Sequence, residues 1–253
     1  MAFLELLNVD KSFGGVKAVH NFTLTVQEGE LVGLIGPNGA GKTTVFNLIT
    51  GLYPVDNGQI FFQGEDLSPL KPYEIIPRGI ARTFQNLRLF ARVSALENVI
   101  TAYRKCQYSF LEALFHAGRW KLSEAEARKR ALELLDFMGL ADKALQAAGT
   151  LPYGHQRRVE IARALALEPK LLLLDEPAAG MNPEEIEDLN MLIKRICTNL
   201  GITIIVIEHH MELVMEICDR VACMNFGAKI AEGTPDEIQS HPEVLAAYLG
   251  EEA

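Results

Sequence analysis

The sequence predicts an α/β fold with a parallel core sheet, and three short apolar runs lead to this prediction. They lie at Leu31–Ile35, Leu171–Leu174 and Ile202–Ile207 in the 253 residues. Runs of this length and composition are typical of strands buried on both faces, and helical patterns separate them. Ligands bind outside the carboxyl ends of such strands. The residues that follow each run are therefore the first candidates for a functional site.

The residues after the first run are predicted to form a phosphate-binding loop. Residues 36–43 fit G-x-x-x-x-G-K-[ST] at every fixed position, and a helical stretch follows and ends before Gly51. Glycines let the backbone bend so that N–H groups point at phosphate oxygens, and the helix adds its positive end. We expect Lys42 to reach the β- and γ-phosphates and the Thr43 hydroxyl to ligate Mg²⁺. The alternative is a glycine-rich turn with a chance lysine.

The nucleotide is expected to be ATP, because the N-K-x-D element that reads guanine is absent. The residues expected to contact it in the loop are Gly36, Pro37, Asn38, Gly39, Ala40, Gly41, Lys42, Thr43 and Thr44. Lys42 is counted among the catalytic residues as well, since it lies where charge develops during phosphoryl transfer.

Acidic and polar side chains follow the other apolar runs. Asp175 ends the second run, and an aspartate in that position beside a phosphate loop holds Mg²⁺, usually through a water. Glu176 is expected to orient and polarise the attacking water; a surface acid at a strand end is the alternative. Gln85 is a candidate sensor of the metal or the water, and His209 a candidate donor to the γ-phosphate. A single Gln or His is more often structural, so both alternatives stay open.

The N-terminal part of the chain predicts an antiparallel sheet. Two stretches within residues 3–26 alternate apolar and polar residues around the turn at Gly14-Gly15, and further strands are expected at 59–62 and 80–84. Phe13 stands at the turn, where it could stack on a nucleotide base or simply cover the sheet edge.

We expect one domain, residues 1–253, with a helical subdomain inserted at 94–150. Within it a capping box is predicted at residues 123–126, before the apolar stripe of a helix. The stripe consists of Ala127, Ala131, Leu134, Leu135 and Met138. An aromatic and basic cluster could be a solvated surface or a docking patch; its members are Phe110, Phe115, Arg119, Trp120 and Lys121. A further helix should start at Asn182-Pro183-Glu184-Glu185 and end at Gly201.

The composition argues against several classes of protein. With 24 basic and 33 acidic residues the net charge is -9, which disfavours a nucleic-acid partner. The four cysteines form no C-x-x-C pair, so neither a zinc site nor a disulfide frame is indicated. No apolar run approaches the roughly 18 residues of a membrane span, and no signal peptide is evident. If the protein acts at a membrane, another chain is expected to supply the membrane part.

Taken together, these residues resemble the ATP-binding subunits of ABC transporters over essentially the whole chain. The resemblance implies that Phe13 stacks on the base, that Gln85 is the Q-loop residue and that Asp175-Glu176 is the Walker B pair. It also implies that His209 is the switch histidine. An ATPase with ATP and Mg²⁺ is thus expected on the cytoplasmic face of the inner membrane, peripherally bound. The implied partners are integral membrane permease subunits, a second ATPase subunit and, indirectly, a periplasmic or extracellular solute-binding protein.

Four segments are similar, more narrowly, to the G-type ATPases of high-affinity branched-chain amino acid importers. They are residues 82–90, 177–183, 233–235 and 247–251. The alternatives that stay open are an ATPase of amide or urea import, one of lipopolysaccharide export, and a soluble ABC protein of DNA repair or translation.

Two departures from the family pattern affect the expected assembly. The family signature Leu-Ser-Gly-Gly-Gln is replaced at residues 151–155, with Pro152, Tyr153 and His155 at altered positions, and Asn182 stands where aspartate is common. Proline has neither a hydroxyl nor an N–H group to offer a phosphate. A heterodimer with an ATPase that carries a regular signature is therefore expected, and a homodimer is the alternative.

Overall fold

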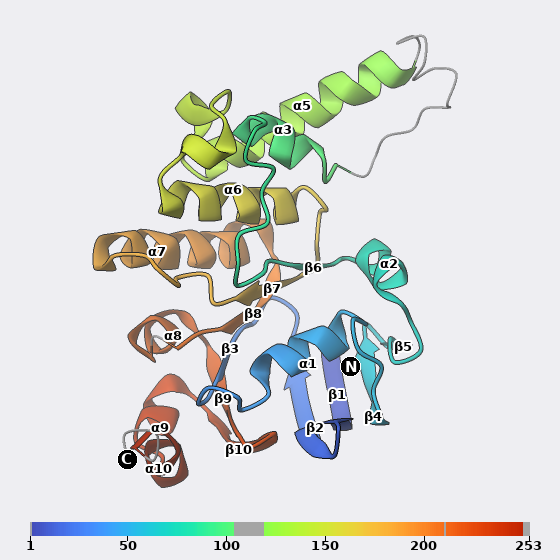
Figure 1. Ribbon diagram of the computed structural model, residues 1–253, viewed down its shortest axis with the longest axis vertical. Coiled ribbons are helices and arrows are strands. Elements are labelled where there is room, and N and C mark those ends of the chain that lie inside the picture. Colours follow the sequence, from blue (N-terminus) through green and yellow to red (C-terminus); the bar gives the residue numbers. More distant parts are fainter. Residues whose placement is uncertain (1, 104–118, 210, 250–253) are drawn as a thin grey trace. The chain divides into compact units, whose positions relative to one another are not determined.

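The computed structural model describes residues 2–103, 119–209 and 211–249. The chain divides into two compact units, the first made of residues 1–82 with 170–253 and the second of residues 83–169 (Figure 1).

The first unit contains the predicted parallel sheet. Its strand order is β10-β9-β3-β8-β7-β6, and all neighbours are parallel except the last hairpin, β9 and β10. The strands are β3 (Leu31–Ile35), β6 (Ile80–Arg82), β7 (Leu171–Asp175), β8 (Thr203–Ile207), β9 (Arg220–Asn225) and β10 (Ala228–Gly233). Every residue of β3, β7 and β8 is buried, as their continuous apolar sequences predict.

A second, antiparallel sheet of the first unit has the order β2-β1-β4-β5. Its strands are β1 (Leu4–Phe13), β2 (Val16–Val26), β4 (Asn57–Phe62) and β5 (Glu65–Asp66). The predicted hairpin is confirmed, since Gly14 and Gly15 both have positive φ between β1 and β2.

The helices of the first unit are α1 (Lys42–Ile49), α2 (Pro72–Ile75), α7 (Pro183–Leu200), α8 (Met211–Ile217), α9 (Pro235–Gln239) and α10 (Pro242–Leu249), with a 3₁₀ turn at Ile76–Arg78. The predicted start of α7 is confirmed: Asn182 caps it, Pro183 is its first residue and Glu185 closes the capping box. Gly201 follows in the left-handed conformation that ends helices.

The main core of the first unit packs α1 against strands of both sheets. Val45, Phe46 and Ile49 of α1 are fully buried in one apolar cluster with residues such as Leu6 of β1 and Ile205 of β8. Burial of side chains of this size stabilises the fold by about 1.5–3 kcal/mol each. The start of α1 is therefore anchored on a rigid base.

The second unit is helical. It contains α3 (Ala95–Ile100), α5 (Arg119–Phe137) and α6 (Tyr153–Leu165), with 3₁₀ turns at Ala141–Lys143 and Ala148–Thr150. The three helices pack on one another, and all five residues of the predicted stripe, four on α5 and Met138 directly after it, are buried. The expected subdomain, 94–150, lies inside this unit.

Two local predictions were wrong. The strand expected at 80–84 ends at Arg82, because its parallel pairing with β7 stops there. No helix starts at Ser123: α5 already runs from Arg119, and Ser123 is buried within it. Ser94 and Glu97 instead form a capping box, at the start of α3.

The aromatic and basic cluster, residues 110–121, lies where the structure describes no side chains.

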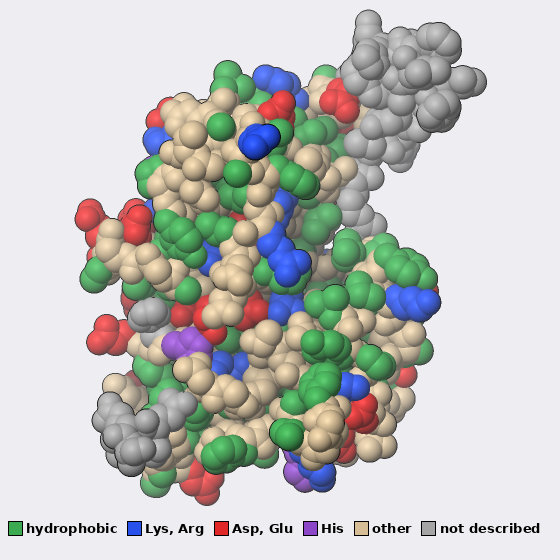
Figure 2. All heavy atoms as spheres, viewed as in Figure 1, with side chains coloured by type: hydrophobic (Ala, Val, Ile, Leu, Met, Phe, Trp, Pro, Cys, Tyr) green, Lys and Arg blue, Asp and Glu red, His purple; other side chains and the backbone are tan. Residues whose placement is uncertain are grey.

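The surface carries charges of both signs. On the face that Figure 2 shows, Lys and Arg side chains are interspersed with acidic and apolar ones. Among the described residues, no helix combines the length and the apolar character that crossing a bilayer requires.

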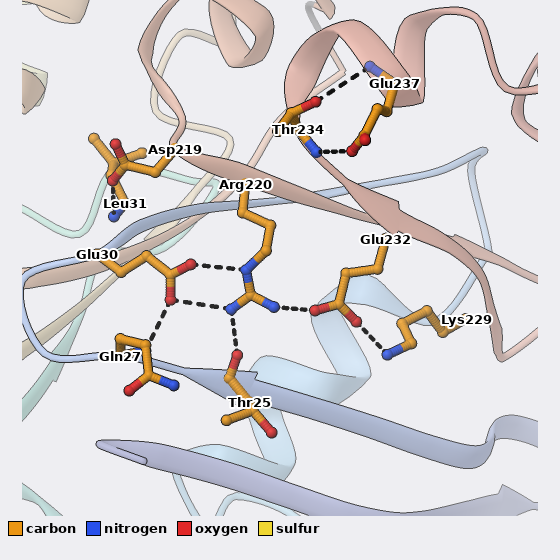
Figure 3. Close-up of polar contacts among 10 residues, drawn as sticks. All are labelled: Thr25, Gln27, Glu30, Leu31, Asp219, Arg220, Lys229, Glu232, Thr234 and Glu237. Carbon is orange, nitrogen blue, oxygen red and sulfur yellow. Dashed lines mark hydrogen bonds and ion pairs between the residues drawn. The ribbon is translucent and has the colours of Figure 1, made fainter. Parts of the chain in front are cut away.

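Arg220 ties the two sheets of the first unit together (Figure 3). From β9, its Nε donates to Glu30 Oε1 at 2.7 Å, and its Nη groups donate to the Thr25 carbonyl of β2 and to Glu232 of β10. These ion pairs raise the pKa of Arg220, with the Glu30 hydrogen bond as the main cause. Lys229 also donates to Glu232.

We predict that Arg220→Met lowers the free energy of unfolding by about 2–3 kcal/mol, because Glu30 and the Thr25 carbonyl lose hydrogen bonds from a charged donor. Urea titration followed by circular dichroism measures this change. Lys229→Met is the matched control and should cost about 1 kcal/mol or less, as for other partly exposed ion pairs. Equal losses in the two variants would contradict a bridging role of Arg220.

Candidate functional site

The phosphate-binding loop follows β3 directly, and two of its glycines are required by close backbone contacts. Gly36 has φ 143° and Gly41 has φ 105°. A Cβ atom at Gly36 would lie 2.1 Å from the carbonyl oxygen of Met224, and one at Gly41 2.2 Å from that of Ala18. Other side chains would meet both backbone strain and a clash with rigid backbone. The two glycines therefore allow the loop to pack closely against the backbone of β9 and β2.

Lys42 turns back into the curve of this loop. Its side chain is buried, and Nζ donates to the carbonyl oxygens of Gly36 and Pro37 at 2.6 and 2.8 Å. Burial raises the pKa of the Cys223 thiol to about 11, although the positive charge of Lys42 lowers the pKa of this thiol. The thiol therefore stays neutral at pH 7. The ammonium group is thus held by loop carbonyls, at the start of α1, where a phosphate would add the negative charge.

Asp175 ends β7 and is almost fully buried. Its Oδ2 accepts a hydrogen bond of 2.7 Å from Nη2 of Arg82, and Nη1 of Arg82 donates to Asn47 Oδ1 of α1 at 2.6 Å. Arg82 therefore connects the carboxylate to the helix that carries Thr43. The hydroxyl of Thr43 and the carboxylate of Asp175 are hard oxygen donors, the kind that Mg²⁺ prefers. These donors fit the expected metal.

Glu176 and His209 form a close pair just beyond the ends of the neighbouring strands β7 and β8. His209 Nε2 lies 2.6 Å from Glu176 Oε1, and the Glu176 N–H donates to the carbonyl of Ile207 at 2.9 Å. Glu176 has φ 46°, a left-handed conformation that is uncommon for a residue with a side chain. Such strain is held in place by the surrounding structure and clusters at functional sites. The backbone thus turns this carboxylate toward the imidazole.

Two residues of this region were missed by the sequence analysis. Glu208 is buried, and its carboxylate accepts hydrogen bonds from the N–H groups of Ala178 at 2.7 Å and His209 at 3.1 Å. Tyr248 of α10 accepts one through its hydroxyl from the Gly36 N–H at 2.8 Å. An acid at the end of a buried strand was a signal for Glu208. For Tyr248, 212 residues from its partner, the sequence carried no local signal.

Phe13 lies at the end of β1, as predicted, and 41% of its surface is exposed. Its ring meets Tyr53 edge to face, with 5.0 Å between ring centroids, and Lys11 Nζ lies 5.5 Å from the ring centroid. An exposed aromatic pair of this kind offers a surface on which a nucleotide base can stack.

Gln85 and the altered signature belong to the second unit. Gln85 is exposed, and its backbone carbonyl oxygen accepts a hydrogen bond from Arg157 at 2.8 Å. Pro152 precedes α6 in the N-cap position without a side-chain cap, and Tyr153 is the first residue of the helix. Serine at Pro152 would supply the hydroxyl that caps a helix.

Comparisons with known proteins agree with this geometry. A family model described as ABC transporter matches residues 19–179, and one described as branched-chain amino acid ATP-binding cassette transporter matches residues 228–253. The high-affinity branched-chain amino acid transport ATP-binding protein BraF of Pseudomonas aeruginosa is 45% identical over 249 residues, which cover 98% of both chains. LivG of Salmonella typhimurium, named for the same transport, is 44% identical over 94% of both chains.

A solved structure gives the same result. The ADP conformation of MJ1267, an ATP-binding cassette of an ABC transporter, superposes with a TM-score of 0.87 at 34% identity and with 99% of both chains covered. The α/β architecture of two sheets with a phosphate-binding loop is therefore that of the ABC ATPases, as predicted. The chain belongs to the ABC transporter family of ATP-binding proteins and is an ABC-type ATPase.

Proposed function

We propose that this chain is the ATP-binding and ATP-hydrolysing subunit of an importer of branched-chain amino acids. The buried ammonium of Lys42, curled inside the phosphate loop, carries the nucleotide part of the proposal. The proposal for the solute rests on the relatives. The similarity to BraF extends over 98% of the chain, and the family model that matches residues 228–253 names the same class of solute.

In the proposed mechanism each residue of the site has one role. Lys42 and the loop N–H groups bind the β- and γ-phosphates, and the aromatic pair at Phe13 stacks on the base. Thr43 and Asp175 would hold Mg²⁺, with Gln85 as a further ligand or sensor, and a metal bound there would supply positive charge beside the phosphate oxygens. Glu176 orients and polarises the attacking water.

His209 supports Glu176 in this scheme. Nε2 of His209 lies 2.6 Å from the carboxylate and can hold it in one orientation. Since a neutral imidazole carries one N–H donor, this group would turn from Glu176 to a γ-phosphate oxygen when ATP binds. The Glu208 carboxylate accepts hydrogen bonds from the N–H groups of His209 and Ala178, so it links the segment of His209 to the segment that follows Glu176.

The assembly is proposed on the same basis. The chain acts as one ATPase domain, residues 1–253 with the inserted helical region 94–150, on the cytoplasmic face of the membrane. It works with integral membrane permease subunits and, indirectly, a solute-binding protein outside the membrane. The second ATPase subunit is a different chain with a regular signature, because Pro152 supplies neither a hydroxyl nor an N–H group to a nucleotide.

We predict that Lys42→Ala abolishes productive ATP binding, because it removes the cation placed inside the phosphate loop. Isothermal titration calorimetry with Mg²⁺ present measures this loss. Lys143→Ala, which removes a surface partner of Asp142, is the control and should bind as the unchanged protein does. Unchanged affinity in Lys42→Ala would refute the nucleotide site.

We predict that Glu176→Gln retains ATP binding and slows hydrolysis by about 10²- to 10⁴-fold, the usual effect of losing a positioned acid-base group. Phosphate release under saturating ATP gives the rate. Glu184→Gln, an exposed acid in the first turn of α7, should leave turnover unchanged. Turnover equal to that of the unchanged protein in Glu176→Gln would identify Glu176 as a structural acid.

We predict that affinity purification of the full-length chain from detergent-solubilised membranes isolates permease subunits and a second ATPase chain. After reconstitution with the solute-binding protein, leucine, isoleucine or valine should raise ATP hydrolysis. Stimulation by amides, urea or lipopolysaccharide alone would assign another transporter, and recovery of this ATPase only as a homodimer would contradict the heterodimer.

A further inference from the structure

The second unit contains a buried ion pair that the proposed mechanism does not use. Arg157 is fully buried in α6 and Glu160 is 2% exposed, one turn further along the same helix. Arg157 Nη1 donates to Glu160 Oε2 at 2.7 Å. Burial raises the pKa of the Glu160 carboxyl, and Arg157 acts against that rise. A buried pair of this kind contributes little net stability compared with apolar side chains, so its presence needs another explanation.

The remaining donors of Arg157 reach the segment that carries Gln85. Nη1 donates to the carbonyl of Phe84 at 2.7 Å and Nη2 to that of Gln85 at 2.8 Å. Residues 83–93 form neither helix nor strand, so their carbonyl groups have no regular backbone ladder to join. One planar guanidinium thus fixes two consecutive peptide groups, a geometry for which its fork of donors is suited.

Glu160 and Arg88 make further contacts that hold the Gln85 segment. Glu160 Oε1 accepts a hydrogen bond of 3.3 Å from the Arg88 N–H, and the Arg88 guanidinium lies 4.2 Å from the centroid of the Phe84 ring. The carboxylate therefore both neutralises Arg157 and holds the far side of the Gln85 segment. The backbone on either side of Gln85 is tied to α6, while the Gln85 side chain is exposed.

The altered signature takes part through Tyr153. Its hydroxyl accepts a hydrogen bond of 3.2 Å from Arg157 Nη2, and the guanidinium lies 5.9 Å from the centroid of its ring. Glycine, the family residue at this position, has no side chain to make either contact. The tyrosine that breaks the signature pattern is thus the residue that links the start of α6 to Arg157.

We propose that Arg157 is the positioning residue for Gln85, and that Arg157, Glu160 and Tyr153 join the Q-loop segment to the signature end of α6 as one rigid part. This rests on the proposed function, in which Gln85 acts on the metal or the attacking water. A shift of Gln85 then moves the start of α6 with it, and the reverse holds as well.

A double-mutant cycle on the full-length ATPase, in its isolated assembly, tests this coupling. Arg157→Lys keeps the positive charge and loses the planar fork. We expect kcat to fall about 10-fold, as for one lost hydrogen bond to a charged group, with KM for ATP changed less than about 2-fold. In a Gln85→Ala background the same substitution should have no further effect on kcat, because Arg157 acts only through Gln85.

A control variant and a second test variant separate the outcomes. Arg130→Lys, in a surface ion pair of the same unit, should leave kcat unchanged in both backgrounds. Tyr153→Phe removes a single hydroxyl from a partly exposed ring and serves if Arg157→Lys fails to fold; we expect about a 2-fold lower kcat, again absent in the Gln85→Ala background. If Arg157→Lys lowered kcat further in the Gln85→Ala background, the positioning role of Arg157 would be overturned, while the role of Gln85 would stand. If Gln85→Ala itself had the kcat and Mg²⁺ dependence of the unchanged protein, the assignment of Gln85, and with it this inference, would fail.

Discussion

The site depends on one constraint, the order of three neighbouring parallel strands. β8 lies between β3 and β7, and Leu34 and Asp175 pair on either side of Ile207. Their carboxyl ends therefore share one edge of the sheet, where the loop of residues 36–43 and the segments of Glu176 and His209 begin. The pairing of Glu176 with Ile207 and His209 follows from this adjacency rather than from any local sequence signal. A different strand order would separate the same motifs.

Three buried charged side chains are each held in one orientation by their hydrogen-bond partners. The carboxylates of Asp175 and Glu208 and the guanidinium of Arg157 are nearly or fully removed from water, and each makes hydrogen bonds at 2.7 Å. Desolvation makes such groups costly unless they are paired, so their partners fix their orientation firmly. In the first unit the two carboxylates lie at the carboxyl ends of β7 and β8, and in the second unit the guanidinium holds the segment of Gln85.

The departures from the family signature have different structural consequences. Pro152 takes a position at the start of α6 where a hydroxyl could have capped the helix or met a phosphate. Tyr153 instead gains contacts with Arg157 that glycine could not make. The altered signature therefore lacks a hydroxyl and an N–H group at Pro152 and gains a contact within its own unit through Tyr153.

The sequence by itself determined the fold class, the parallel core strands, the phosphate loop and the acids after β7, because each depends on short-range pattern: continuous apolar runs, glycines that permit positive φ, and capping residues. It failed where local signals compete. Ser123 lies inside a helix although its neighbours imitate a cap, and β6 ends early because pairing with β7 stops at Arg82.

Only the tertiary structure decided which distant residues meet. The contact of Arg82 with Asp175, that of Tyr248 with Gly36 and that of Arg157 with Gln85 join positions 93, 212 and 72 residues apart. No periodicity or motif spacing encodes such pairs, since they arise only when packed elements bring a donor and an acceptor from distant parts of the chain together.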